Sequence, residues 1–83
     1  IVLANIGTTM TEARDSIPTI QEILKKYAIK SSYVHADAAL AGAYLPLLGV
    51  HDFDFAHGAD SVAMSGHKFI GSPITNGVVI VKK

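Results

Sequence analysis

The chain has 83 residues, of which 49% are hydrophobic, and its seven basic and seven acidic side chains cancel to a net charge of zero. Because no run of Lys or Arg creates a basic surface, we expect no nucleic-acid partner. No apolar stretch approaches the roughly 20 residues that a membrane-spanning helix needs, so we expect no membrane partner. The absence of cysteine excludes a disulfide scaffold and fits a reducing compartment, which makes the cytoplasm the expected location.

The two ends of the sequence indicate a piece of a longer protein. The chain begins with Ile1 rather than Met, and its last residues, Val79–Lys83, still have the pattern of a strand. It contains no internal repeat and no low-complexity linker. We therefore expect residues 1–83 to form a single partial domain.

The first third of the chain predicts a strand followed by a helix. Ile1–Ala4 is a continuous apolar run that stops at a polar loop, which is typical of a strand buried on both faces. Over Ile17–Tyr27 apolar residues recur at helical spacing, with Asp15 or Ser16 as the cap and Pro18 in the first turn. This pattern predicts an amphipathic helix.

The rest of the chain predicts three more strands, over Tyr33–Asp37, Ser61–Met64 and Val78–Val81. The apolar stretch Leu45–Leu48 is ambiguous, and the polar block His51–Gly58 indicates a surface excursion. A helix between the first two strands implies a parallel crossover, and the short connection between the last two implies an antiparallel pair. The predicted fold class is therefore α/β, with a mostly parallel sheet and one antiparallel strand.

Polar side chains follow three of the predicted strands at the ends where ligands collect in an open α/β sheet. If these strands run parallel, an amine, a carboxylate, an imidazole and several hydroxyl groups meet in one crevice. The residues at the three strand ends are Asn5, Thr8 and Thr9, then Asp37, then Ser65, His67 and Lys68.

Lys68 and Asp37 each have an ordinary interpretation and a functional one. A lysine directly behind a buried strand becomes partly desolvated and can form a Schiff base, although Lys68 is equally typical of a surface turn. Asp37 either caps the next segment or pairs with the positive charge of a ligand. As a pair they match the needs of pyridoxal phosphate (PLP), whose aldehyde is held by a lysine and whose ring nitrogen is kept protonated by a carboxylate. The small Ala39 would let a flat ring lie close, with Ser65, His67 and Thr9 as donors to its oxygens.

A metal site is a weaker hypothesis. Four potential ligands lie in one short stretch, but their spacing fits no standard metal site, and a solvated loop is the simpler interpretation. We therefore expect no metal. The four residues are His51, Asp52, Asp54 and His57.

Two other arrangements compete with the cofactor pair. His35 and Asp37 share one face of a strand, where a hydrogen-bonded structural pair is the commoner outcome. A triad built on Ser65 and His67 lacks the Gly-x-Ser-x-Gly elbow that such a nucleophile needs. The glycine signatures of nucleotide-binding loops are absent as well.

The segments Ala4–Thr9, His35–Leu40 and Ser65–Pro73 resemble the group II PLP-dependent amino-acid decarboxylases, and within them the bacterial histidine decarboxylases of the pyridoxal type. The resemblance runs in order along essentially the whole chain. It implies a fragment of the large domain of a fold-type I enzyme, similar to aspartate aminotransferase, and a homodimer with active sites at the subunit interface.

The resemblance also implies a reaction, the conversion of L-histidine to histamine and carbon dioxide, within amino-acid metabolism. Lys68 would hold the cofactor, Asp37 would pair with its ring nitrogen, and Ala39 would pack on one ring face. His67 and Ser65 would lie near the phosphate or the substrate, and Thr9 near the ring's phenolic oxygen. The implied catalytic residues are Lys68, Asp37 and His67.

Three parts expected of the family lie outside this sequence: the residue that stacks on the other ring face, the main phosphate-binding loop and the small C-terminal domain. We therefore expect the 83-residue segment to be inactive alone. Two alternatives remain open at this stage. The same chemistry can act on another amino acid such as serine, since plant serine decarboxylases carry similar segments, or the chain can be a non-catalytic α/β domain that retains the pocket.

Overall fold

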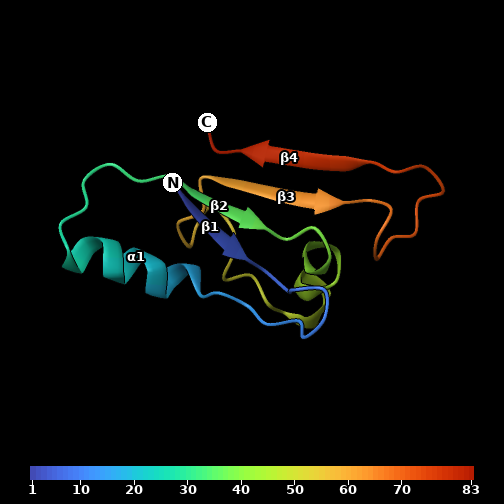
Figure 1. Cartoon of the computed structure of the whole chain (residues 1–83), viewed down its shortest axis with the longest axis horizontal. Coiled ribbons are helices and arrows are strands. Elements are labelled where there is room, and N and C mark those ends of the chain that lie inside the picture. The colour runs from blue at the N-terminus through green and yellow to red at the C-terminus, as the bar shows by residue number, and fades with distance from the viewer.

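Four strands pair into one sheet in the computed structural model, which describes all 83 residues (Figure 1). The strands are β1 (Val2–Asn5), β2 (Val34–Asp37), β3 (Ser61–Ser65) and β4 (Gly77–Val81), and they lie in this order across the sheet. β1 and β2 are parallel, as are β2 and β3, whereas β3 and β4 are antiparallel. The predicted α/β fold with one antiparallel strand is confirmed.

The connection between β1 and β2 contains the predicted helix, α1 (Ile17–Lys26). Ser16 is its cap, because the Ser16 side chain accepts a hydrogen bond from the Thr19 backbone N–H at 3.3 Å. Asp15, the other candidate, has a different role: its carboxylate accepts a hydrogen bond from the backbone N–H of Asn5 at 2.8 Å. The start of the helix is thereby tied to the end of β1. With ten residues, α1 is too short to cross a membrane, and no other helix of the chain is long or apolar enough.

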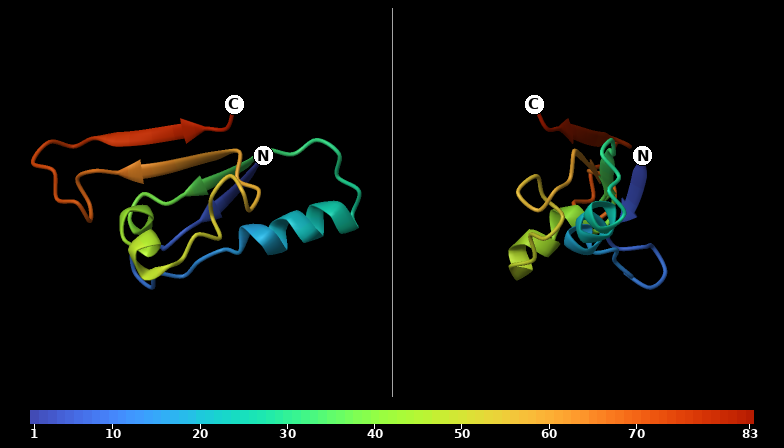
Figure 2. Two further views of the ribbon diagram at one scale, coloured as in Figure 1. Left: turned by 180° about the vertical axis from the view of Figure 1, so that it is seen from behind. Right: turned by 90° about the vertical axis from the view of Figure 1, so that its left-hand side faces the viewer.

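One face of the sheet is covered and carries the core. Ala4, Ala36 and Val62 are neighbours in the strand register and are all buried, and Ile17 and Leu24 of α1 belong to the same apolar cluster. Figure 2 shows α1 and the connection before β3 on this same side of the sheet. The two are linked by the Gln21 side-chain amide, which donates to the Gly58 carbonyl at 2.7 Å.

The opposite face of β1 is open. Successive side chains of a strand point to opposite faces, and only one face is covered by elements of this chain. Leu3 is 58% exposed and Asn5 is also exposed. The expectation that the first strand is buried on both faces is therefore wrong for this chain. The register places Asn5 beside Asp37 on the open face.

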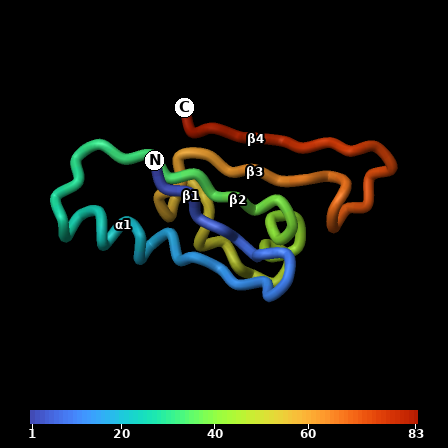
Figure 3. The backbone as a smooth tube through the Cα atoms, viewed as in Figure 1, coloured from blue at the N-terminus to red at the C-terminus, as the bar shows by residue number.

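The ambiguous apolar stretch after β2 forms two short 3-10 helices, η1 (Ala41–Ala43) and η2 (Leu45–Leu48). η1 is wedged between two neighbours. A Cβ at Gly42 would lie 2.6 Å from Met64 Cγ of β3, and a Cβ at Gly7 would lie 2.5 Å from the Ala41 Cβ. Figure 3 shows the turn after β1 and the segment after β2 running side by side at this end of the sheet.

β4 lies at one edge of the sheet and is exposed on both faces. Its four apolar side chains alternate between the two faces of the sheet, and their exposed fractions lie between 46% and 62% on both faces. These residues are Val78, Val79, Ile80 and Val81.

The close contact at Gly7 predicts a large effect of a single methyl group. Gly7→Ala should lower the free energy of unfolding by about 2–4 kcal/mol, since Gly7 has a φ of +87° and the new Cβ would meet Ala41. Gly49→Ala is the matched control, because Gly49 has a φ of +78° with no atom near its Cβ position. Urea unfolding of both variants measures the difference. Equal losses in the two variants would mean that the contact with Ala41 contributes nothing.

Candidate active site

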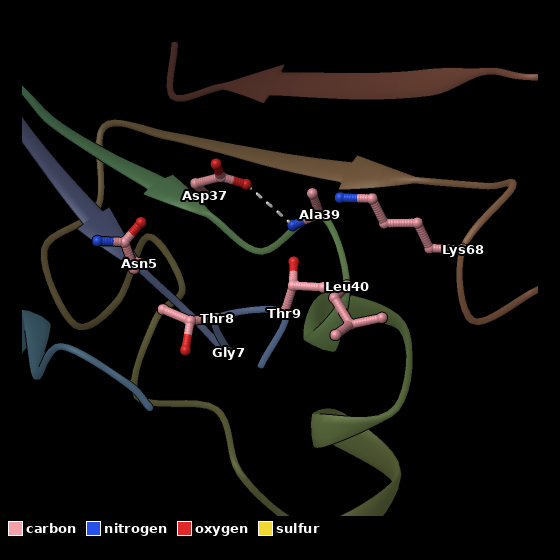
Figure 4. Close-up of a pocket in the computed structure, with 8 residues that line it drawn as sticks. All are labelled: Asn5, Gly7, Thr8, Thr9, Asp37, Ala39, Leu40 and Lys68. Carbon is pink, nitrogen blue, oxygen red and sulfur yellow. Dashed lines mark hydrogen bonds between the residues drawn. The ribbon is translucent and has the colours of Figure 1, made fainter. Parts of the chain in front are cut away.

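A cavity of about 250 Å³ opens at the carboxyl ends of β1 and β2, on the uncovered side of the sheet (Figure 4). It collects residues from three segments that are far apart in the sequence: the turn after β1, the end of β2 with the turn that follows it, and the turn after β3. Its lining consists of Asn5, Gly7, Thr8, Thr9, Asp37, Ala39, Leu40 and Lys68.

Asp37 is the last residue of β2, and its side chain is partly buried. Its Oδ1 accepts a hydrogen bond from the Ala39 backbone N–H at 3.1 Å, so the carboxylate caps the turn after the strand. This bond orients the carboxylate and leaves Oδ2 to accept a hydrogen bond from a molecule in the cavity. The capping and ligand-binding interpretations of Asp37 are therefore compatible.

The turn after β1 places Thr9 in the cavity lining. Backbone N–H groups of Gly7 and Thr8 both donate to the Ala13 carbonyl, which closes the turn. The Thr8 hydroxyl lies 2.9 Å from the Thr11 hydroxyl and is used within the turn. The hydroxyl of Thr9 instead points toward Ala39 across the cavity (Figure 4).

Lys68 reaches the cavity from the turn after β3. Its side chain extends toward Ala39 and the end of β2 (Figure 4). The residue is exposed, so the interpretation of Lys68 as a surface-turn lysine is the one that the structure bears out, and this chain does not desolvate it. The physical reason is that no element of the chain packs over this turn from the open side of the sheet.

Ser65 and His67 lie close to Lys68 in the sequence but outside the lining of this cavity. Ser65 lines a second, mostly apolar cavity of about 340 Å³, formed by the end of β3, the turn after it and the start of β4. The His67 Nδ1 lies 2.8 Å from the Asn76 carbonyl oxygen, so the ring braces the turn against the segment before β4. The structure thus brings Thr9, Asp37, Ala39 and Lys68 together and places the other two residues beside them.

Neither the predicted pair of His35 with Asp37 nor a cluster of metal ligands forms in the structure. His35 lies with its Nδ1 2.6 Å from the Ser61 hydroxyl of β3, so it bonds to the neighbouring strand rather than to Asp37. No group of three or more potential metal ligands comes together in the chain. In the block after η2, Asp52 lies 3.6 Å from the Arg14 guanidinium.

Two side chains have shifted pKa values. Desolvation raises the pKa of the Tyr44 hydroxyl, and the nearby negative charge of Glu12 and a hydrogen bond with it raise the pKa further. Desolvation would also raise the pKa of Asp54, but hydrogen bonds from His57 outweigh it and hold the pKa below the ordinary value of 3.8. The His57 Nδ1 lies 2.7 Å from the carboxylate.

Two lining residues were missed by sequence reasoning. Gly7 lies two residues after β1, and a glycine followed by two threonines is a sequence signal of a turn, so its place near the cavity was accessible from the pattern. Leu40 offers no such signal, because an apolar residue after a run of alanines is equally typical of a core. Asn5 and Thr8 were both anticipated as strand-end groups.

In α/β proteins, small-molecule sites lie at the carboxyl ends of parallel strands, and the cavity found there in this chain presents an amine and a carboxylate. The model of the pyridoxal-dependent decarboxylase conserved domain matches residues 1–83. The chain belongs to this family.

The relatives include histidine decarboxylases from two bacteria. The chain is 52% identical to that of Mesorhizobium japonicum over 84 residues and 54% identical to that of Acinetobacter baumannii over 86 residues. In both cases all of this chain is covered, but it spans only 23% and 22% of the relatives' length.

Solved structures of the family share the fold. The glutamate decarboxylase of Lactobacillus brevis superposes with a TM-score of 0.81 and 27% identity over 95% of this chain and 19% of its own. Oryza sativa TDC, solved with PLP and tryptamine, gives a TM-score of 0.75 and 30% identity over 96% of this chain and 16% of its own.

The pairing of Asp54 with His57 predicts a pH dependence. A carboxylate with a lowered folded pKa stabilises the folded state above its ordinary pKa, and that stabilisation is lost as the pH falls through the folded pKa. We expect His57→Gln to move the pKa of Asp54 upward. Titration of the Asp54 carboxyl carbon by NMR measures this shift, with Asp52 as the internal control. An Asp54 pKa that is the same in both proteins would contradict it.

Proposed function

We propose that this chain is the central part of the cofactor-binding domain of a PLP-dependent decarboxylase that converts L-histidine to histamine and carbon dioxide. The observation that carries the proposal is the convergence of Asp37 and Lys68 on one cavity, with Ala39 between them. A non-catalytic domain would have no need to retain both groups in this arrangement.

The cavity lining has the chemistry that PLP requires. It offers an amine for the aldehyde, a carboxylate for the ring nitrogen and the small Ala39 where a flat ring would lie. It also supplies the Thr9 hydroxyl for a ring oxygen. Lys68 is the only cation of the lining, so the phosphate requires donors from other parts of the protein. When bound, the cofactor supplies an electron sink for the electron pair left behind by the departing carboxylate.

The residues of the chain have separate tasks in this proposal. Asp37 holds a proton on the ring nitrogen through Oδ2, while its Oδ1 is kept in place by the Ala39 N–H. Lys68 Nζ would anchor the cofactor through its aldehyde carbon, and the exposed position of Lys68 leaves room for a substrate amine to approach that carbon and displace the lysine amine. Two further residues, His67 in the turn that carries Lys68 and Ser65 at the end of β3, are proposed to contact the substrate or the phosphate.

The choice of histidine as substrate rests on the relatives. Two bacterial enzymes that share about half of their aligned residues with this chain are histidine decarboxylases. Solved neighbours with lower identity have other names, among them a glutamate decarboxylase. Another amino acid, such as serine, is therefore the second candidate. We also propose a homodimer and a cytoplasmic location, as the resemblance implies.

An assay of amine products tests the reaction and the substrate together. The full-length protein that contains this segment is incubated with PLP and with histidine, serine, glutamate or 2,4-diaminobutyrate, each in a separate reaction. We expect histamine from histidine and no amine from the other three. A different amine product would show that the substrate is another amino acid and would leave the reaction unchanged. Cofactor binding without any amine product would overturn the proposed reaction.

The role of Lys68 has a direct chemical test. Borohydride reduction of the full-length protein with PLP should leave a pyridoxyl label on the peptide that contains Lys68, and Lys68→Ala should abolish the label. Lys30→Ala, at an exposed site away from the cavity, is the control and should keep it. A wild-type label that maps to any other lysine would refute the assignment.

The role of Asp37 predicts a separation of binding from turnover. Asp37→Asn keeps a hydrogen-bonding group of the same size but removes the negative charge, so we expect the cofactor to remain bound. Turnover should fall by about a hundredfold or more, the scale of a positioned group that controls a proton. Unchanged kcat in this variant would remove the argument for a charged partner of the ring nitrogen.

A further inference from the structure

An aromatic contact joins the segment after β2 to the turn that carries Lys68. The rings of Tyr44 and Phe69 have centroids 5.0 Å apart and are tilted by 51°, a favourable geometry for an aromatic pair. Phe69 directly follows Lys68 in the sequence, and Tyr44 lies between η1 and η2. The contact therefore links the turn that carries Lys68 to the short helices that follow β2.

Tyr44 is a firm support for this contact. Its backbone N–H donates to the Ala41 carbonyl at 3.1 Å, so it is continuous with η1. The close contacts of Gly42 with Met64 and of Ala41 with Gly7 wedge η1 against β3 and the turn after β1. The Tyr44 ring therefore extends from the end of η1, the short helix that packs against β3 and the turn after β1.

The turn is held at its start by another contact. The Ser65 N–H donates to the Ala39 carbonyl at 3.1 Å, which fixes the end of β3 beside the cavity. Further along, the Ser72 N–H bonds back to the Gly66 carbonyl within the turn itself. Between these points, Phe69 is 55% exposed and its ring contact with Tyr44 reaches across to the segment after β2.

We propose that Tyr44 is a positioning residue whose ring holds Phe69, and thereby keeps Lys68 directed into the cavity beside Asp37 and Ala39. The inference rests on the proposed function, because it assigns a purpose to the position of Lys68.

A double-mutant cycle tests this contact in the full-length protein. Tyr44→Leu and Phe69→Leu should each weaken PLP binding and slow covalent attachment at Lys68 by about two- to tenfold, the scale of one aromatic pair. The double variant should lose no more than either single variant, because both substitutions remove the same contact. Tyr44→Phe keeps a ring and should stay within about twofold of wild type.

The control and the second readout separate positioning from general stability. Tyr27→Leu replaces an exposed tyrosine away from the cavity and should leave attachment unchanged. In the cofactor-free protein, hydrogen exchange of the backbone amides over residues 66–72 should speed up in Tyr44→Leu and Phe69→Leu but not in Tyr27→Leu. This readout does not depend on bound PLP.

Each outcome bears on one proposal. If wild-type protein is labelled at Lys68 and the aromatic variants match it in binding and exchange, the positioning role is refuted and the proposed function stands. Losses that multiply in the double variant would also refute it, because the two rings would then act independently. If exchange responds as expected but wild-type protein takes no label at Lys68, the contact is supported and the proposed function fails.

Discussion

The arrangement of the cavity depends on the tight fit of η1 between the strand ends. Two positions without a side chain, Gly7 and Gly42, allow the turn after β1 and the strand β3 to approach this short helix more closely than a Cβ would permit. Steric exclusion of this kind is a strong constraint, because packed interiors do not yield smoothly to extra atoms. Three chain segments with different tasks are thereby held in one relative position.

The second determinant is the alternation of side chains along the strands. The row that contains Ala4, Ala36 and Val62 faces α1 and is buried, so the row that contains Asn5 and Asp37 must face the other way. A carboxylate on the covered face would sit among apolar groups at a high cost in desolvation. On the open face, the same carboxylate is oriented by a backbone N–H and remains accessible to a charged ligand.

The fold was predictable from the sequence because its signals are local. Short apolar runs bounded by polar turns and one stretch at helical spacing are enough to define the strands, α1 and the crossover. The meeting of Asp37 with Lys68 followed from the parallel arrangement. The exposure of Lys68, by contrast, depends on what packs over its turn, and the separate position of His67 depends on its contact with Asn76. No sequence pattern predicts either the packing over the Lys68 turn or the contact between His67 and Asn76.

The exposed edge strand β4 has a consequence for association between chains. An apolar strand with a free row of N–H and C=O groups is a template for pairing with any other extended chain. Lys82 and Lys83 follow Val78–Val81 at once, in the place where charged gatekeeper residues limit such pairing. Two adjacent positive charges at the end of β4 therefore disfavour aggregation through this edge.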